Sequence, residues 1–332
     1  MPVLSPLTVS RTYFVTGAQG CIGSWVVRLI LEQGDRAVLF DLDHHDKRLA
    51  QVLSPEQLAA VDRVQGDVTD TAVVRQAIEA CQADAIIHLA GLQVPFCAAD
   101  PVLGARVNVV GTLNMFEAAR AIGLPRLVYA SSAAVYDQAE GLEQVDESVT
   151  PAPATHYGVY KLANEGNARV YWQDAGLASV GLRPLTVYGL GRDQGLTSGP
   201  TRALKAASLG RAFTIGFSGP TDFLYVADAA RAFVECATAP LDGARIFNLH
   251  GESVDVAAAV ALMDEVLPEP QRGLIQVDGP VLPIAPRLSD AALRAALPDL
   301  PSTSLREGFG ATLQHFQELA SAGRLPTDDL DS

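Results

Sequence analysis

The chain has 332 residues, of which 48% are hydrophobic and 19% are charged, and its formal net charge is −14. This balance is typical of a globular protein, and the length allows one large domain or two. The acidic charge argues against a nucleic-acid partner, because phosphate backbones are bound by basic patches. A small anionic ligand is still allowed, since local arginines can override the global sign.

The cysteines and the two chain ends give no sign of a metal site or a membrane. Cys21, Cys81, Cys97 and Cys236 are widely spaced, and no pair has the spacing of a metal or redox motif. We therefore predict no metal site and reduced thiols in a cytoplasmic protein. Residues 1–10 do not resemble a signal peptide, and no apolar run approaches the ~20 residues of a membrane span. Residues 323–332 form an acidic tail, and we expect its end, residues 326–332, to be frayed.

The first strand is followed at once by a glycine loop. Residues 12–16 are predicted to form a buried strand and residues 24–33 a helix, with glycines between them at Gly17, Gly20 and Gly23. A strand, a glycine loop and a helix in this order direct free backbone N–H groups at a pyrophosphate. The spacing, Gly-x-x-Gly-x-x-Gly, differs from the usual Gly-x-Gly-x-x-Gly fingerprint. The context nevertheless favours a dinucleotide site over a simple turn.

Asp41 ends the second predicted strand, residues 36–40, and lies 18 residues after Gly23. An acidic residue about 20 positions after the glycine loop binds the ribose 2′-hydroxyl of NAD. Its charge would repel a 2′-phosphate, so NAD is favoured over NADP. An aspartate that simply begins a loop is the alternative interpretation.

Strands and helices then alternate up to residue 130. Strands are predicted at 61–65, 84–89 and 125–130, and helices at 71–81 and 101–122. Asp67 is placed to accept a hydrogen bond from an adenine amino group, although a helix cap near Thr69 or Asp70 is a simpler role for this cluster. The small residues Ala90 and Gly91 allow the backbone to approach a ligand. His88 is expected to pack under the sheet.

Tyr157 and Lys161 are the pair on which a catalytic prediction depends. Four residues apart in a predicted helix over 157–175, they lie on one face. A nearby ammonium group favours the phenolate, so the pair can move a proton on or off a hydroxyl. Ser132 stands after the fifth strand, at the edge where ligands of doubly wound sheets bind. A turn serine and an ordinary amphipathic helix are the alternatives.

The second half of the chain is predicted to continue with shorter elements. A strand over 178–182 leads into Arg183 and Pro184, and a glycine-rich loop over 187–199 contains Arg192. Further strands are expected at 212–215 and 246–249, and an entry strand precedes a helix within 223–238. Helices are expected near 200–209, 254–267, 289–297 and 304–321.

Taken together, these landmarks resemble the extended short-chain dehydrogenase/reductase family, the NAD-dependent epimerase/dehydratase group. The resemblance covers roughly residues 11–322. It is carried by residues 16–23, 66–68, 88–91, 108–112, 131–136, 183–184 and 222–228, together with the Tyr157/Lys161 pair.

The resemblance implies a Rossmann-type doubly wound parallel sheet over 11–185 and a smaller, mainly substrate-binding domain over 186–322, with parts of 222–250 returning to the first domain. It implies Tyr157 as the acid/base, Ser132 as the partner of the reacting oxygen, and Lys161 as a ligand of the nicotinamide ribose. A homodimer is expected, with the helices that carry Asn108 and Tyr157 at its interface. The implied NAD-binding residues are Gly17, Gln19, Gly20, Cys21, Ile22, Gly23, Asp41, Asp67, Val68, Leu89, Ala90, Gly91, Asn108, Tyr157, Lys161 and Pro184.

Three positions depart from the family pattern. Ala133 and Ala134 occupy the place of the acidic pair of dehydratases, so no acid is present to expel water, and members that use a cysteine after the serine also differ. Thr221 replaces the arginine that meets the phosphate in nucleotide-sugar enzymes. Arg287 is a loose match to a second phosphate-binding arginine.

These features predict an NAD-dependent dehydrogenase that acts on a secondary alcohol of a sugar or sugar-derived acid. The alternatives are a nucleotide-sugar 4-epimerase with tightly held NAD and, from another class, a non-catalytic NAD-sensing protein. An intact Ser-Tyr-Lys set argues against the sensor. The substrate is expected to be small and without a nucleotide, and Arg192 or Arg183 is expected to meet a carboxylate unless it is a structural ion-pair partner. The predicted substrate contacts are Gln93, Phe96, Ser132, Ala133, Arg183 and Arg192.

Overall fold

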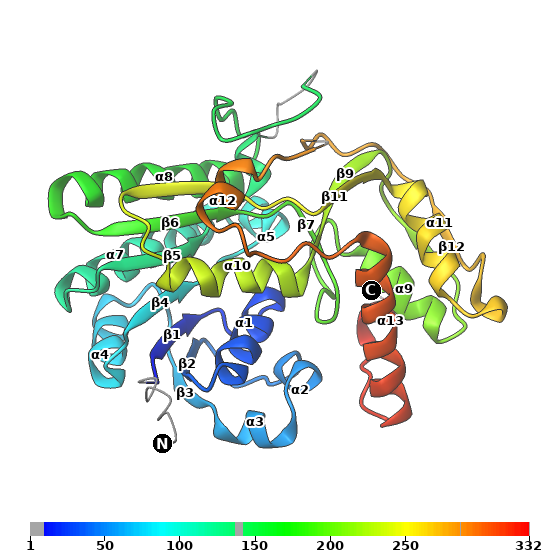
Figure 1. Cartoon of the computed structure of the whole chain (residues 1–332), viewed down its shortest axis with the longest axis horizontal. Helices are drawn as coiled ribbons and strands as arrows, with labels where there is room; N and C mark the ends of the chain where they lie inside the picture. The colour runs from blue at the N-terminus through cyan, green and yellow to red at the C-terminus, as the bar shows by residue number, and fades with distance from the viewer. Residues whose placement is uncertain (1–9, 137–141, 286, 332) are drawn as a thin grey trace, which may run out of the picture.

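The computed structural model describes residues 10–136, 142–285 and 287–331. Its centre is a seven-stranded sheet in the order β10-β6-β5-β4-β1-β2-β3, and every strand pair in it is parallel (Figure 1). This order confirms the predicted Rossmann-type doubly wound fold. The strands are β1 (Thr12–Thr16), β2 (Arg36–Asp41), β3 (Asp62–Gln65), β4 (Ala85–His88), β5 (Arg126–Ala130), β6 (Ala178–Arg183) and β10 (Ala244–Asn248).

Helices cover both faces of this sheet because successive strand residues point to opposite sides. In β1, Val15 packs into a core shared with α1 (Cys21–Glu32) and α10 (Val226–Thr238), whereas Phe14 packs into a separate core on the other face. The helices of that second face are α4 (Thr71–Cys81), α7 (Gly111–Ala121) and α8 (His156–Ala175). The glycine loop before α1 is thereby fixed at the carboxyl ends of the strands.

Among the described residues, the second half of the chain adds two small sheets and, besides α10, four helices. The three-stranded sheet has the order β11-β9-β7, and β8 pairs with β12. One hydrophobic core contains residues from Tyr13 to Leu319, so both halves share it. The elements are β7 (Thr186–Tyr188), α9 (Gly199–Ser208), β8 (Phe213–Ile215), β9 (Pro220–Tyr225), β11 (Glu252–Asp255), α11 (Val256–Val266), β12 (Ile275–Val277), α12 (Ala291–Ala296) and α13 (Leu305–Ser321). Strands β7, β11 and β12 were not predicted, because short strands leave little periodic signal.

The single helix predicted over 101–122 is interrupted by a π-helical turn. The segment consists of α6 (Pro101–Ala105), the turn η1 (Arg106–Val110) and α7. The carbonyl of Asn108 accepts hydrogen bonds from Thr112 Oγ1 at 2.7 Å and Asn164 Nδ2 at 2.8 Å, and these side chains replace part of the regular helical ladder. A π-helical turn of this kind is frequent at functional sites.

The prediction that the acidic tail is frayed is wrong for residues 326–331. Residues Asp328–Leu330 form a short 3₁₀ helix, and Asp329 and Leu330 are buried. Asp329 is ion-paired with the equally buried Lys205, and Asp328 binds Lys47 with an N–O distance of 2.6 Å. The acidic end is therefore docked by specific opposite charges. No helix in the described part of the chain is long and apolar enough to span a membrane.

We expect Asp329→Asn to destabilise the fold strongly. The change leaves the ammonium group of Lys205 buried without its counter-charge, a loss that typically costs about 3–5 kcal/mol. Urea unfolding of purified protein measures the difference. The matched control is Asp331→Asn, because Asp331 pairs with Arg211 in an exposed site where a surface ion pair contributes only about 0–1 kcal/mol. Equal destabilisation by the two variants would contradict the assignment.

Candidate active site

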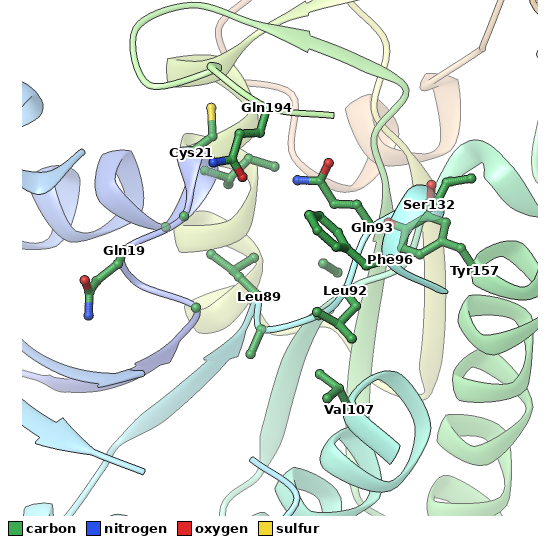
Figure 2. A pocket seen from close by; sticks show the side chains of 18 of the residues that line it. Gln19, Cys21, Leu89, Leu92, Gln93, Phe96, Val107, Ser132, Tyr157 and Gln194 are labelled. Atoms are coloured by element: carbon green, nitrogen blue, oxygen red, sulfur yellow. The ribbon is translucent and has the colours of Figure 1, made fainter. Parts of the chain in front are cut away.

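A cavity of about 1060 Å³ lies along the carboxyl ends of the central strands (Figure 2). Its walls come from the turns after β1, β2, β4 and β5, from α8, and from the loop after β7. This is the edge at which doubly wound sheets bind their ligands. The cavity is therefore the candidate site for both a cofactor and a substrate.

The glycine loop leaves a backbone cradle at the start of α1. A Cβ on Gly17, whose φ is +63°, would lie 2.6 Å from the backbone nitrogen of Ala90, and one on Gly23 would lie 2.2 Å from the carbonyl oxygen of Gly17. Only glycine allows this approach. Helix α1 has no side-chain N-cap and no acidic residue in its first turn, so its amide groups are available to an anion. These residues fit the pyrophosphate of a dinucleotide.

Asp41 lies at the end of β2 and is tied to the same loop. Its carboxylate accepts hydrogen bonds from the backbone N–H of Gln19 at 3.2 Å and of Leu42 at 2.9 Å. Burial raises the pKa of Asp41, and these two hydrogen bonds act in the opposite direction. Asp41 lines the cavity, as does Asp67, whose Oδ1 accepts from the backbone N–H of Thr69. The cap of α4 is Asp70, which agrees with the simpler role considered for this cluster.

Ser132, Tyr157 and Lys161 all line the cavity. Figure 2 shows Ser132 and Tyr157 among the side chains that line the cavity, and the Lys161 Nζ lies 5.5 Å from the centre of the Tyr157 ring. Lys161 is 4% exposed and donates a hydrogen bond of 2.8 Å to the carbonyl of Ala130. A strand end and one face of a helix thus bring together a hydroxyl, a phenol and an ammonium group.

Burial controls the titration of the groups behind this wall. It lowers the pKa of Lys161 to about 8. It also lowers the pKa of His88 to about 3, with the charge of Lys161 as a second cause. His88 contacts Thr16 Oγ1 at 2.6 Å and Thr112 Oγ1 at 3.0 Å, so its ring is a neutral packing group under the sheet, as predicted. Lys161 therefore supplies the positive charge beside the phenol.

Most of the predicted site residues line the cavity. Among the predicted cofactor residues these are Gly17, Gln19, Gly20, Cys21, Ile22, Gly23, Asp41, Asp67, Val68, Leu89, Ala90, Gly91, Tyr157, Lys161 and Pro184, and among the predicted substrate residues they are Gln93, Phe96, Ser132 and Arg192.

Asn108 and Ala133 stand behind the cavity wall. Asn108 is fully buried, and its amide donates to the carbonyls of Leu92 at 3.2 Å and Gly104 at 3.1 Å. It supports the turn after β4 from behind, so the prediction of direct cofactor contact is replaced by a positioning role. Ala133 is 2% exposed and does not line the cavity, which argues against the predicted substrate contact.

Arg183 is a correction to the predicted substrate contacts. Its guanidinium is 3% exposed, lies outside the cavity lining, and bonds to both carboxylate oxygens of Glu165, at 2.7 and 2.5 Å. Tyr136 is a further partner. Because this buried bidentate pair holds the guanidinium away from the cavity, the structural ion-pair alternative applies here.

Several residues that line the cavity were not predicted from the sequence, and they come from segments that are far apart in the chain. They include Arg48 in the loop after β2, Leu196 in the loop after β7, and Ile284 near the C-terminal end. Neither charge pattern nor spacing singles these out, because only the fold brings them to the cavity. No group of three potential metal ligands occurs among residues 10–136, 142–285 and 287–331.

Comparison with known proteins identifies the family. A model of the NAD-dependent epimerase/dehydratase family matches residues 13–249. The chain belongs to this family. A UDP-glucose 4-epimerase of Mycolicibacterium smegmatis is 30% identical over 318 residues, which cover 91% of this chain and 97% of that protein. The resemblance to the extended short-chain dehydrogenases is thereby confirmed, as is NAD as the cofactor of the family.

Two further matches show how far the likeness extends. UDP-glucuronate 4-epimerase 6 of Arabidopsis thaliana is 34% identical over 182 residues, which cover 53% of this chain but only 39% of that protein. The UDP-glucose 4-epimerase of Thermus thermophilus, solved in complex with NAD, is 28% identical with a TM-score of 0.76, covering 92% of this chain and 99% of that chain. The chain thus matches about two fifths of the plant relative and nearly the whole length of these two bacterial family members.

We expect Lys161 to make stability depend on pH above neutrality. The folded chain releases this proton near pH 8, whereas the unfolded chain holds it to about 10.5. Between these values the unfolded state binds more protons, so the contribution of Lys161 to the free energy of unfolding becomes more favourable as pH rises. Urea unfolding of the wild type and of Lys161→Met measures this effect. The free energy of unfolding of the wild type, relative to that of Lys161→Met, should increase as pH rises across this range. A difference that does not change with pH would contradict the burial of a charged Lys161.

Proposed function

We propose that this member of the family is an NAD-dependent dehydrogenase that oxidises a secondary alcohol of a sugar or sugar-derived acid. The observation that carries the proposal is that Ser132, Tyr157 and Lys161 line one cavity with the glycine loop, with Lys161 beside the Tyr157 ring. A non-catalytic sensor would not require an acid/base pair beside a serine hydroxyl. The cavity is also large enough for a dinucleotide and a small second molecule.

The roles of the chain's residues follow from their chemistry. NAD, when bound, supplies the hydride acceptor, so that an alcohol and NAD give a ketone, NADH and a proton. Ser132 donates a hydrogen bond to the reacting oxygen, and Tyr157 removes the hydroxyl proton as a general base. Lys161, whose ammonium lies 5.5 Å from the centre of the phenol ring, favours the phenolate. The glycine loop and Asp41 hold the pyrophosphate and the adenosine ribose.

The charges near the cavity favour a substrate without a nucleotide. Thr221, in place of the family's phosphate-facing arginine, is buried and contacts Thr186 Oγ1 at 2.7 Å. Arg287 is exposed and does not line the cavity, and Arg183 is bound to Glu165. A diphosphate is usually held by charge-assisted arginine bonds, and those three positions do not supply one.

A nucleotide-sugar 4-epimerase is the second candidate, and the names of the relatives favour it. It would use the same proton transfer, followed by return of the hydride to the opposite face, without net oxidation. The two functions differ in whether NADH accumulates during turnover.

A second copy of the chain is the partner that we propose, in a cytoplasmic protein. Helices α6 and α8 expose apolar side chains, among them Val102, Val159, Val170 and Trp172. A shared apolar interface between two copies would cover them. Light scattering coupled to size exclusion measures this, and a monomer at micromolar concentration would contradict it.

The test is NADH formation across free sugars, sugar acids and nucleotide sugars, with NAD and with NADP. We expect turnover with NAD on a sugar or sugar acid, weaker turnover with NADP because of Asp41, and none with nucleotide sugars. Tyr157→Phe should lower kcat by ~10²–10⁴-fold, because it removes the proton acceptor, while NAD still binds. Exposed Gln173→Ala on the same helix serves as the control for helix integrity. Tight calorimetric binding of a uridine or guanosine diphosphate would favour the epimerase instead.

A further inference from the structure

The loop after β7 is fastened to the first turn of α1. We call residues 189–198 the covering loop. Trp25, in α1, donates a hydrogen bond of 2.9 Å from its indole N–H to the carbonyl of Leu190. A Cβ on Gly191 would lie 3.9 Å from the Cα of Cys21 and 3.9 Å from the hydroxyl of Ser24. The covering loop therefore touches the helix end that receives the cofactor pyrophosphate.

Arg48 ties the covering loop to the glycine loop. Its Nε and Nη2 donate to Asp193 Oδ1 at 3.0 and 2.6 Å, and its Nη1 donates to the carbonyl of Gln19 at 3.2 Å. Asp193 is 9% exposed, so this pair is shielded from solvent. Lys47, whose Nζ lies 3.8 Å from Asp193, also binds Asp328 in the C-terminal segment. Ionic contacts thus connect the chain end, the covering loop and the cofactor cradle.

Arg192 lies between these two attachments, and its guanidinium has hydrogen-bonding capacity that the described residues do not use. It lines the cavity, and its Nη2 donates to Thr197 Oγ1 at 3.2 Å. Its Nε is buried and has no hydrogen-bond partner within the described residues. Burial raises the pKa of Cys21 to about 11, and the charges of Arg192 and then Arg48 oppose that rise. The Arg192 guanidinium therefore lies within electrostatic reach of the α1 N-terminus.

We propose that Arg192 binds the pyrophosphate of NAD, and that the Arg48–Asp193 pair holds the covering loop closed over it. A helix N-terminus supplies only about half a positive charge to a group that carries two negative charges. A guanidinium adds a full charge and directional donors. The proposal depends on the proposed function only through the use of NAD.

This assignment also narrows the substrate class. Arg192 was predicted to meet a substrate carboxylate, and Arg183 is already bound to Glu165. If Arg192 binds the cofactor, neither Arg183 nor Arg192 is available to bind the carboxylate of an acidic substrate. The substrate of the proposed dehydrogenase is then a neutral sugar or polyol, which the amides of Gln93 and Gln194 in the cavity lining are suited to bind.

The decisive experiment separates the pyrophosphate from the rest of the cofactor. Calorimetry with ADP-ribose and with adenosine is carried out on the wild type, Arg192→Gln and the control Arg75→Gln, which removes an exposed arginine on α4. We expect Arg192→Gln to weaken ADP-ribose binding on the order of tenfold, as for loss of a charged hydrogen bond, with little change for adenosine. Arg75→Gln should change neither. Arg192→Lys keeps the positive charge but loses the paired donors of the guanidinium. Its affinity for ADP-ribose should therefore lie between those of the wild type and Arg192→Gln.

The second arm measures how the covering loop retains the cofactor. Stopped-flow NADH fluorescence should show faster dissociation from Asp193→Asn, on the order of tenfold, because the ion pair that closes the loop is lost. Thermal unfolding of each variant checks that the fold is intact. Unchanged ADP-ribose affinity in Arg192→Gln would overturn the proposal, and a raised KM for acids alone would return Arg192 to the substrate. Failure to turn over any alcohol would refute the proposed function and leave these binding results interpretable.

Discussion

The close backbone approach between the glycine loop and the turn after β4 is the constraint on which the site depends. With a side chain at Gly17, the Cβ would lie 2.6 Å from the nitrogen of Ala90, and the two turns could not meet. That contact fixes where α1 begins and leaves its first amide groups uncapped. The same turn, supported from behind by Asn108, leads into Gln93 and Phe96, which also line the cavity. The contact between the glycine loop and the turn after β4 therefore positions residues in both parts of the cavity.

The distribution of charge shows why a net charge of −14 is a poor guide to the site. Arg48, Lys161 and Arg192 line the cavity together with five aspartates, Asp41, Asp43, Asp46, Asp67 and Asp193. Burial sharpens the effect of each cation, because the low dielectric screens it less than water does. An acidic protein can thus place individual cations at chosen points of a cavity whose charges are mixed.

Spacing in the sequence predicted the placement of Tyr157 and Lys161 in the cavity wall better than it predicted the partners of individual arginines. Tyr157 and Lys161 lie four residues apart in a helix, so local geometry alone puts them on one face. Arg183 and Arg192 look equally available in the sequence, yet one is bound to Glu165 of α8 and the other opens into the cavity. Their partners come from distant segments, and no local pattern encodes such a choice.

The sequence by itself determined the doubly wound sheet, the glycine loop, Asp41 at the end of β2, and the Ser-Tyr-Lys wall. Each follows from short-range periodicity or from a fixed position at a strand end. Only the tertiary structure decided that the acidic tail docks on Lys47 and Lys205, and that β7, β11 and β12 become strands. Those outcomes depend on contacts between segments far apart in the chain, where burial and pairing with a particular partner outweigh local preference.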